Sequence, residues 1–316
     1  MSEIDNSKWK PNLVKKRTIV SLPNVSHNPN QHLKVKTTKD LIKLNKSKPN
    51  VDLNKQAVTH NKLRLVSDIR KKNKGKLKRV KTIYQSKDPS PDSLSKIRAL
   101  KNVGQGRILV IIANGPSISE LDLTKLVMIN NIDIMSINKP DPRLWPTTYW
   151  AFYDTSQYRR HRELISEYKG YILNSTAIVN VFNSKAMQFK NLGEMGFSLN
   201  AEKGIHIGRS SVYASMQVAH HMNYDKTFIF GCDMNPDGIG GKLHFYGDNP
   251  DVDPNVRGNR FKKEAEYYDW AGNQLNQDIR KKFYFCSSYN NWSFTNKFNH
   301  MDHKDAFNHL CEINNG

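Results

Sequence analysis

The amino-acid sequence predicts an α/β protein with a doubly wound, mostly parallel sheet. Three observations predict this class: short unbroken apolar runs, polar turns directly after them, and amphipathic segments between them. Strands of a parallel sheet are covered by helices on both faces, so they are apolar throughout rather than at alternate positions. We therefore expect a Rossmann-like domain over residues 101–316. A basic, largely extended or disordered arm over residues 1–100 precedes it.

The first strand is expected at residues 108–113, because all six are apolar and four of them are β-branched. Asn114, Gly115, Pro116 and Ser117 follow at once. Gly115 permits a sharp turn and the close approach of a ligand, and Pro116 suits the first turn of a helix. A strand, a tight turn and a helix N-terminus together form an anion-binding pocket. A connection between a strand and a helix that binds no ligand has the same sequence pattern.

The elements between residues 118 and 203 follow from shorter patterns. Apolar runs and helical spacing predict strands over 132–137, 148–153, 171–173 and 177–182, and helices over 118–126 and 158–168. Residues 183–203 carry little pattern, and we interpret them as an insertion. Polar side chains follow two of the strands: Asn138 follows the second strand, and Asp154 and Ser156 follow the third.

A second candidate anion site comes later, where Arg209, Ser210 and Ser211 precede a helix over 212–222. An arginine and two hydroxyls at a helix N-terminus favour a bound anion. A buried strand over 226–231 then leads to Asp233, and 283–286 is the last strand expected. The carboxyl ends of parallel strands meet at one edge of a sheet, where ligands bind. We therefore expect one nucleotide-sized crevice lined by Asn114, Ser117, Asn138, Asp154, Ser156, Arg209, Ser211 and Asp233.

The positive charge of the chain is concentrated in residues 1–100. These contain 25 Lys and Arg against 7 Asp and Glu, whereas residues 101–316 contain 24 against 22. Low hydrophobicity with high net charge predicts an arm that is largely disordered alone, with short helices such as one over 93–101. We expect the arm to bind nucleic acid or another polyanion, with salt-dependent affinity. An acidic protein partner and a solvated tail remain alternatives, and DNA is not distinguished from RNA.

Cys232, Cys286 and Cys311 are widely spaced and form no CxxC pair. This argues against a disulfide framework and a structural zinc site, and it favours a reducing cytoplasm. No apolar run reaches the roughly 20 residues of a membrane span, and the N-terminus lacks the apolar core of a secretory signal. His300, His303 and His309 lie near the C-terminus, where we expect a solvated end rather than a metal site.

Several motifs carry a resemblance to known enzymes: NGPS, SIN, FYDTS and GRSSVYASMQVAHHMNYDKTFIFGCDM, over about residues 107–235. Together they resemble the bacterial sialyltransferases of the Campylobacter lipooligosaccharide type. They also resemble a wider Rossmann-like group that includes archaeal 6-hydroxymethylpterin diphosphokinase-like enzymes and phage relatives. The resemblance implies a bacterial or phage-infected host cytosol. It also implies that Asn114, Gly115, Ser117, Asn138 and Ser211 hold a cytidine nucleotide.

The sequence departs from the sialyltransferase pattern at two places. Asp154 stands where that family has an asparagine, and the family's general-base histidine falls in residues 255–264, which contain no histidine. The nearest histidine is His244, whose ordinary pKa suits acid–base work, although a surface histidine is the alternative. Tyr246 lies in the same loop, where the resemblance implies a donor to the leaving phosphate.

These features predict a glycosyltransferase-like enzyme that uses a nucleotide sugar donor, CMP-linked by the resemblance, and acts on or is tethered to nucleic acid. His244 is the predicted base, and Arg209 or Tyr246 would neutralise the leaving phosphate. One alternative is a non-catalytic nucleotide- or nucleic-acid-binding protein that keeps the fold. Another is a diphosphokinase-like enzyme, which would need ATP and Mg²⁺. The sequence does not specify the acceptor, the oligomeric state or whether sugar transfer needs Mg²⁺.

Overall fold

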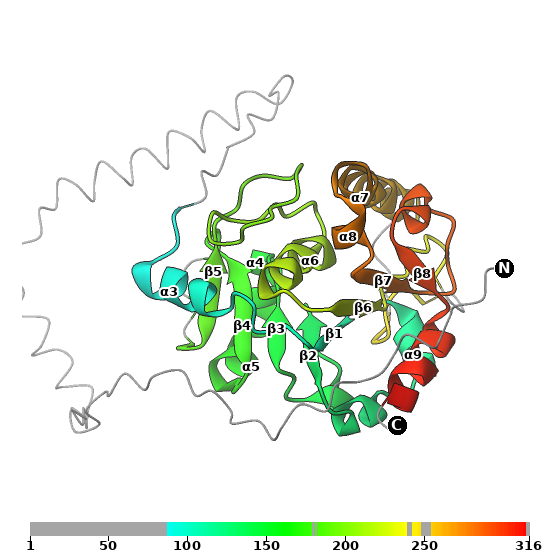
Figure 1. Ribbon diagram of the computed structural model, residues 1–316, viewed down its shortest axis with the longest axis horizontal. Helices are drawn as coiled ribbons and strands as arrows, with labels where there is room; N and C mark the ends of the chain where they lie inside the picture. The colour runs from blue at the N-terminus through cyan, green and yellow to red at the C-terminus, as the bar shows by residue number, and fades with distance from the viewer. Residues whose placement is uncertain (1–86, 179–180, 182, 239–241, 248–253, 314–316) are drawn as a thin grey trace, which may run out of the picture. The chain divides into compact units, whose positions relative to one another are not determined.

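The computed structural model describes residues 87–178, 181, 183–238, 242–247 and 254–313. Its centre is an eight-stranded sheet in the order β5-β4-β3-β2-β1-β6-β7-β8 (Figure 1). Every neighbouring pair in this sheet is parallel, which confirms the predicted α/β fold. The strands are β1 (Ile108–Ile112), β2 (Ile132–Ile137), β3 (Tyr149–Ala151), β4 (Tyr171–Ser175), β5 (Ala186–Phe189), β6 (Lys226–Phe230), β7 (Phe283–Cys286) and β8 (Asn299–Met301).

The direction in which strands are added reverses at β1. From β1 the chain builds β2 to β5 on one side, and it then returns to place β6, β7 and β8 on the other. In an open parallel sheet such a reversal leaves a crevice outside the carboxyl ends of the two central strands. All five residues of β1 are buried, and the strand pairs along its whole length with both β2 and β6. The crevice therefore opens beside a strand that is buried over its whole length and paired on both sides.

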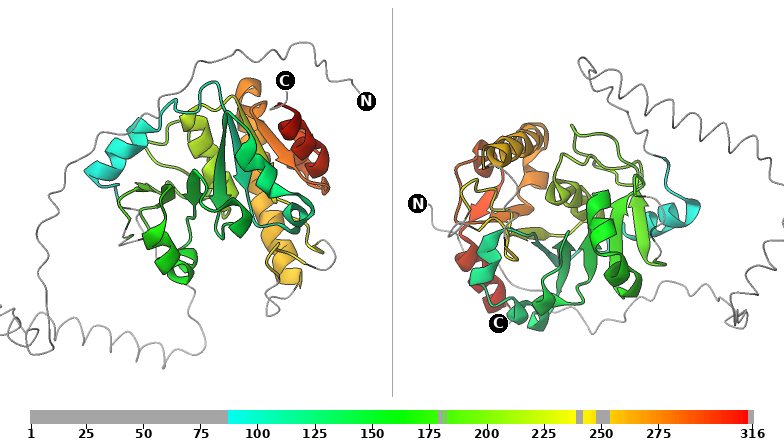
Figure 2. Two further views of the ribbon diagram at one scale, coloured as in Figure 1. Left: turned by 90° about the horizontal axis from the view of Figure 1, so that it is seen from below. Right: turned by 180° about the vertical axis from the view of Figure 1, so that it is seen from behind.

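Helices cover both faces of the sheet (Figure 2). Alternate β1 residues point to opposite faces: Leu109 and Ile111 pack in a core with α6 (Ser211–Met222) and α7 (Pro254–Gln274), and Val110 and Ile112 pack in a core with α9 (His303–Glu312). The other helices are α3 (Pro91–Ala99), α4 (Thr155–Arg160), α5 (Arg162–Glu167), α8 (Gln277–Arg280) and the 3₁₀ helices η2 (Pro116–Glu120), η3 (Leu123–Met128), η4 (Pro142–Leu144) and η5 (Ser293–Asn296).

The helix expected over 93–101 is α3. Its N-cap is Ser90, whose side chain accepts a hydrogen bond from the amide of Ser93 at 3.1 Å. Ile97 and Leu100 are buried in the main core, and the Ile97 carbonyl lies 3.0 Å from Nε2 of His221. The end of the basic N-terminal third is therefore packed on the sheet. The predictions made for residues 1–86, namely disorder, short helices and binding of a polyanion, lie outside the described residues.

Four predicted elements differ from the structure. Residues 118–126 form two 3₁₀ helices instead of one α-helix, because Arg143 donates to the carbonyl oxygens of Leu121 and Ile118, at 2.8 and 3.3 Å. The helix expected over 158–168 is split into α4 and α5 at His161. The fifth strand lies in the expected insertion at β5, and residues 177, 178 and 181 are in no strand. β8 follows β7, so 283–286 is not the last strand.

Two further findings concern the expected environment of the chain. None of the described helices is both long enough and apolar enough to cross a bilayer. Cys232, Cys286 and Cys311 carry free thiols.

Candidate functional site

A cleft of about 920 Å³ opens at the carboxyl ends of the central strands. It is bounded by the segments after β1, β2, β3 and β6, by the N-terminus of α6, by the loop 242–247 and by one face of α7. Twelve of the predicted site residues line it: Asn114, Gly115, Pro116, Asn138, Asp154, Ser156, Arg209, Ser210, Ser211, Asp233, His244 and Tyr246. The structure thus brings together residues that are up to 132 positions apart (114 to 246) in the sequence.

Ser117 is the predicted residue that does not line the cleft. It is fully buried, its hydroxyl donates to Asp233 Oδ1 at 2.6 Å, and its amide donates to Asp233 Oδ2 at 3.0 Å. Ser287, after β7, also donates to Oδ1 at 3.3 Å. Burial raises the pKa of Asp233, and the Ser117 hydrogen bonds oppose this shift. Asp233 therefore holds the turn after β1 against the ends of β6 and β7.

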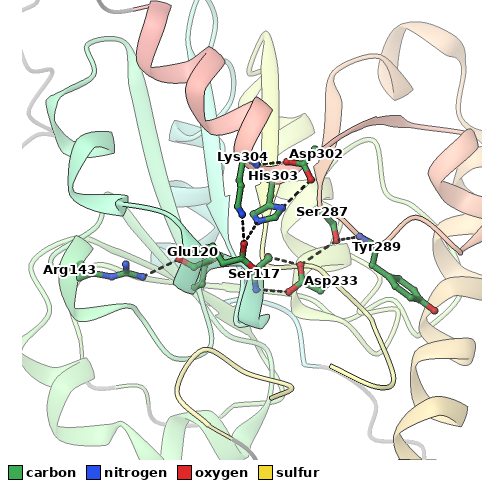
Figure 3. A network of polar contacts seen from close by, with 10 residues as sticks. Ser117, Glu120, Arg143, Asp233, Ser287, Tyr289, Asp302, His303 and Lys304 are labelled. Atoms are coloured by element: carbon green, nitrogen blue, oxygen red, sulfur yellow. Dashed lines mark hydrogen bonds and ion pairs between the residues drawn. The ribbon is translucent and has the colours of Figure 1, made fainter. Parts of the chain in front are cut away.

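The same turn is held from its other side by the start of α9 (Figure 3). His303 is buried, with Glu120 Oε2 3.4 Å from its Nε2 and Asp302 Oδ2 3.4 Å from its Nδ1. Lys304 adds an ion pair to Glu120 at 2.7 Å. The expectation of a solvated C-terminal end is therefore wrong for His303, since α9 packs against the core. Among the described residues, no cluster of three His, Cys, Asp or Glu side chains is placed to hold a metal ion.

Asn114 and Asn138 join the loops that follow β1 and β2. Asn114 Nδ2 donates to the Lys139 carbonyl at 2.8 Å, and the Asn114 carbonyl accepts from the Phe245 amide at 3.1 Å. Asn138 Oδ1 accepts from the Ser211 hydroxyl at 3.0 Å, which ties the β2 loop to the start of α6. Both asparagines therefore fix the shape of the cleft as well as lining it.

Backbone strain is concentrated at this cleft. Asn138, Arg209 and Met234 line it with φ angles of 56°, 57° and 47°. The other described non-glycine residues with positive φ are all asparagines, which tolerate this conformation better than arginine or methionine. Strained residues persist only where the surrounding structure holds them, and they gather at functional sites. The strain is thus an argument for a functional cleft that does not depend on the polar side chains.

The N-terminus of α6 offers amide groups to the cleft. Ser210 is its N-cap residue, but the Ser210 side chain makes no capping hydrogen bond, and its hydroxyl lies 3.0 Å from that of Tyr268. Ser211 and Val212 begin the 12-residue helix and line the cleft. The first amides of a helix carry a partial positive charge and bind anions readily. A negatively charged ligand group is therefore favoured at this end of the cleft.

Two predicted charged residues are engaged by the protein itself. Arg209 Nε donates to Glu194 Oε2 at 3.1 Å, and this oxygen also accepts from the Tyr267 hydroxyl at 2.8 Å. Part of the Arg209 charge is thus neutralised before any ligand binds. Asp154 is the N-cap of α4, where its side chain accepts from the Ser156 amide at 2.7 Å. Helix capping accounts for an acidic residue at this position without any contact to a ligand.

Tyr246 lies among three positive side chains from three different elements. Lys139 Nζ lies 4.3 Å from the centroid of the Tyr246 ring. Arg160, the last residue of α4, and Arg260, on α7, both line the cleft. Burial raises the pKa of the Tyr246 hydroxyl and the charges of Arg160 and Arg260 oppose this, so both guanidinium groups act on that hydroxyl. The His244 ring stacks on Tyr246, with centroids 5.0 Å apart and planes at 14°.

Glu264 is the one carboxylate of α7 in the cleft wall. It is 5% exposed, and its Oε1 accepts from Arg260 Nε at 2.8 Å. Burial raises the pKa of this carboxyl group, and the charges of Arg260 and Arg209 oppose the shift. Within the described part of the chain, Arg160 and Lys139 have no carboxylate at ion-pair distance, whereas Arg260 has Glu264. Among the described residues, the guanidinium group of Arg160 and the ammonium group of Lys139 are therefore the cations near Tyr246 that no carboxylate pairs with.

Sequence analysis missed Arg160, Arg260 and Glu264. All three reach the cleft from helices, whereas the predicted site residues lie in the turns after strands, before a helix or in a loop. Arg260 and Glu264 are four residues apart, so they share a helix face with Phe261, which also lines the cleft. If a helix had been assigned to residues 255–264, that spacing would have indicated that the two side chains share one helix face. Arg160 is the last residue of the short helix α4, and nothing in its sequence neighbourhood distinguishes it from Arg159.

Comparison of the chain with protein-family models, with curated proteins and with solved structures gives no match.

Proposed function

We propose that the cleft binds a nucleotide-activated sugar and that the protein is a glycosyltransferase-like enzyme. The observation that carries the proposal is that the α6 N-terminus, Arg160 and Arg260 line one cleft where the strand order reverses, with Lys139 over the ring of Tyr246 in the same cleft. These groups attract a phosphate through charge and through aligned amides. A volume of about 920 Å³ suits a ligand as large as a nucleotide sugar.

The roles of individual residues follow from their positions. Asn138, Ser211 and Gly115 line the inner part of the cleft, where the resemblance to sialyltransferases implies the nucleoside. In this proposal the Tyr246 hydroxyl donates to the leaving phosphate, and the nearby Lys139, Arg160 and Arg260 side chains support that role. Arg209 has a smaller part in this proposal than the sequence predicted, because Glu194 engages it. Asp233 and Ser117 hold the turn after β1 in the shape that admits the ligand.

The proposed reaction is a displacement at the anomeric carbon of the donor sugar. An acceptor hydroxyl oxygen forms the new bond to that carbon, and the bond from the carbon to the phosphate oxygen breaks. The phosphate leaves with the electron pair, and its added negative charge is stabilised by the cations near Tyr246. The acceptor proton must pass to a base, and the cleft holds two candidates, His244 and Glu264.

We further propose a nucleic acid as the polyanion that the basic residues 1–100 bind, either as acceptor or as tether. The net positive charge of this segment supports the proposal, because each phosphate contact releases counterions. Free cysteines suit the cytoplasmic location that we propose with it.

The test is turnover by the full-length chain. We expect release of the free nucleotide from one member of a panel of CMP-, UDP- and GDP-linked sugars, assayed with and without Mg²⁺. Adding a radiolabelled sugar donor and a DNA or RNA oligonucleotide tests the acceptor, since label would appear on the oligonucleotide. Binding of a donor without turnover of any would favour a non-catalytic nucleotide-binding protein. Phosphoryl transfer from ATP with Mg²⁺ to a small molecule would favour a diphosphokinase-like reaction instead.

A further inference from the structure

The α7 wall of the cleft contains a buried carboxylate that the resemblance does not assign. Glu264 lies one helical turn after Arg260 and on the same face as Phe261, and all three line the cleft. The helix is held in the main core by Ala265, Tyr268 and Ala271, so the position of Glu264 is fixed by packing. Groups that must meet a substrate accurately are best placed on such rigid elements.

Among the described residues, one oxygen of Glu264 accepts a hydrogen bond and the other does not. Oε1 accepts from Arg260 Nε at 2.8 Å, and no donor among the described residues is bonded to Oε2. Arg260, its ion-pair partner, lines the same cleft. A carboxylate in the wall of a ligand-sized cleft is within the space where a proton acceptor for a bound substrate must lie.

We propose, resting on the function proposed above, that Glu264 rather than His244 removes the proton from the acceptor hydroxyl during sugar transfer. The acceptor oxygen bonds to the anomeric carbon, its proton passes to Glu264 Oε2, and the phosphate leaves with the electrons of the broken bond. No oxidant or further reactant is needed. Glu264 returns its proton to water after the product leaves.

The chemical setting of Glu264 agrees with this role. Four ionisable groups act on it or lie beside it: Arg260 on α7, Arg209 before α6, Cys232 after β6 and Tyr268 on α7. Burial raises the pKa of Glu264 above the ordinary value of 4.5, which makes its carboxylate a stronger base than an exposed glutamate. His244, in contrast, lies in the loop 242–247 rather than on a helix, and its ring stacks on that of Tyr246.

The experiment compares Glu264→Gln with Glu266→Gln in the full-length chain. Glu266 is exposed on the other side of the same helix and does not line the cleft, so it controls for loss of charge on α7. With the nucleotide sugar that the wild type turns over, we expect E264Q to bind within about threefold of wild-type affinity and to lose at least about 100-fold in turnover. E266Q should keep both.

The pH profile and chemical rescue separate proton transfer from a structural role. Wild-type turnover should fall on the acid side as Glu264 becomes protonated, at a pH above 4.5, and this limb should be absent from the residual activity of E264Q. Formate should restore part of the turnover of Glu264→Ala. This variant also replaces E264Q in the comparison if E264Q folds poorly. The assignment of Glu264 as the proton acceptor would be overturned if E264Q turned over within a few-fold of wild type or kept the acid limb. Either result would leave the proposed binding of the donor unaffected. A wild type that binds no nucleotide sugar would contradict the proposed function itself.

Discussion

Replacing Gly115 by alanine is expected to lower the free energy of unfolding by about 3 kcal/mol and to abolish nucleotide binding. The added Cβ would lie 2.4 Å from Asp233 Oδ2 and 2.5 Å from the Gly231 carbonyl oxygen. Neither neighbour can easily move, because Asp233 is buried in its bonds to Ser117 and the Gly231 carbonyl accepts from the Gly115 amide at 2.7 Å. The turn after β1 must therefore shift, and it forms one wall of the cleft.

The measurement is thermal unfolding of G115A beside a matched glycine variant. A loss of about 3 kcal/mol corresponds to a decrease in Tm of roughly 6–12 °C for a domain of this size. Gly258 is inside α7, and a Cβ there would meet Pro236 Cβ only at 3.9 Å. Gly258→Ala should leave the protein as stable as the wild type or raise the free energy of unfolding by about 0.5–1 kcal/mol, through helix propensity. A G115A protein with wild-type Tm would show that the turn is not held as described.

Replacing Arg160 by alanine is expected to weaken binding of a nucleotide phosphate by about 10- to 100-fold. Arg160 is exposed at the end of α4, lines the cleft, and has no carboxylate at ion-pair distance within the described residues. A charge-assisted contact from such a side chain to a phosphate contributes about 1.5–3 kcal/mol. Because the side chain is exposed, its loss should change the free energy of unfolding by less than about 0.5 kcal/mol.

Arg159→Ala is the matched control for this variant. Arg159 precedes Arg160 on the same helix and is equally exposed, but it does not line the cleft. Titration calorimetry with the nucleotide that the wild type binds should show weakened affinity for R160A and near-normal affinity for R159A. The difference should shrink as salt is raised, because exposed charges are screened. Equal affinities of the two variants would mean that the phosphate does not lie at the opening formed by α4 and α7.

The central part of the fold could be predicted because its strands are buried on both faces. β1 is an unbroken apolar run, β2 and β6 are mostly apolar, and the expected boundaries of all three agree with the structure to within one residue. The edge strands β5 and β8 were missed because they are short and carry no such run; β8 is only half-buried over its three residues. Their strand conformation depends on neighbouring elements. β5 is held by α3 through the hydrogen bond between Ser93 and Gln188, and β8 is held by its pairing with β7.

The candidate site could be predicted where it follows strands and not where it depends on tertiary packing. Asn138 and Asp233 follow from topology alone, since the carboxyl ends of parallel strands share one edge. That Ser117 would be buried against Asp233 could not be inferred, because the pair is 116 residues apart in the sequence. Arg160 and Glu264 enter the cleft through the packing angles of α4 and α7, which no local pattern specifies.

The central claim is that the cleft binds a nucleotide-activated donor, and ligand-dependent thermal stability tests it most directly. The full-length chain is heated with a panel of nucleotides and nucleotide sugars, with and without Mg²⁺. A ligand at about 100 times its dissociation constant should add roughly 2.7 kcal/mol to the free energy of unfolding. The account predicts such stabilisation by at least one nucleotide sugar and its reduction in R160A. Stabilisation by none of them, at concentrations well above millimolar, would contradict it.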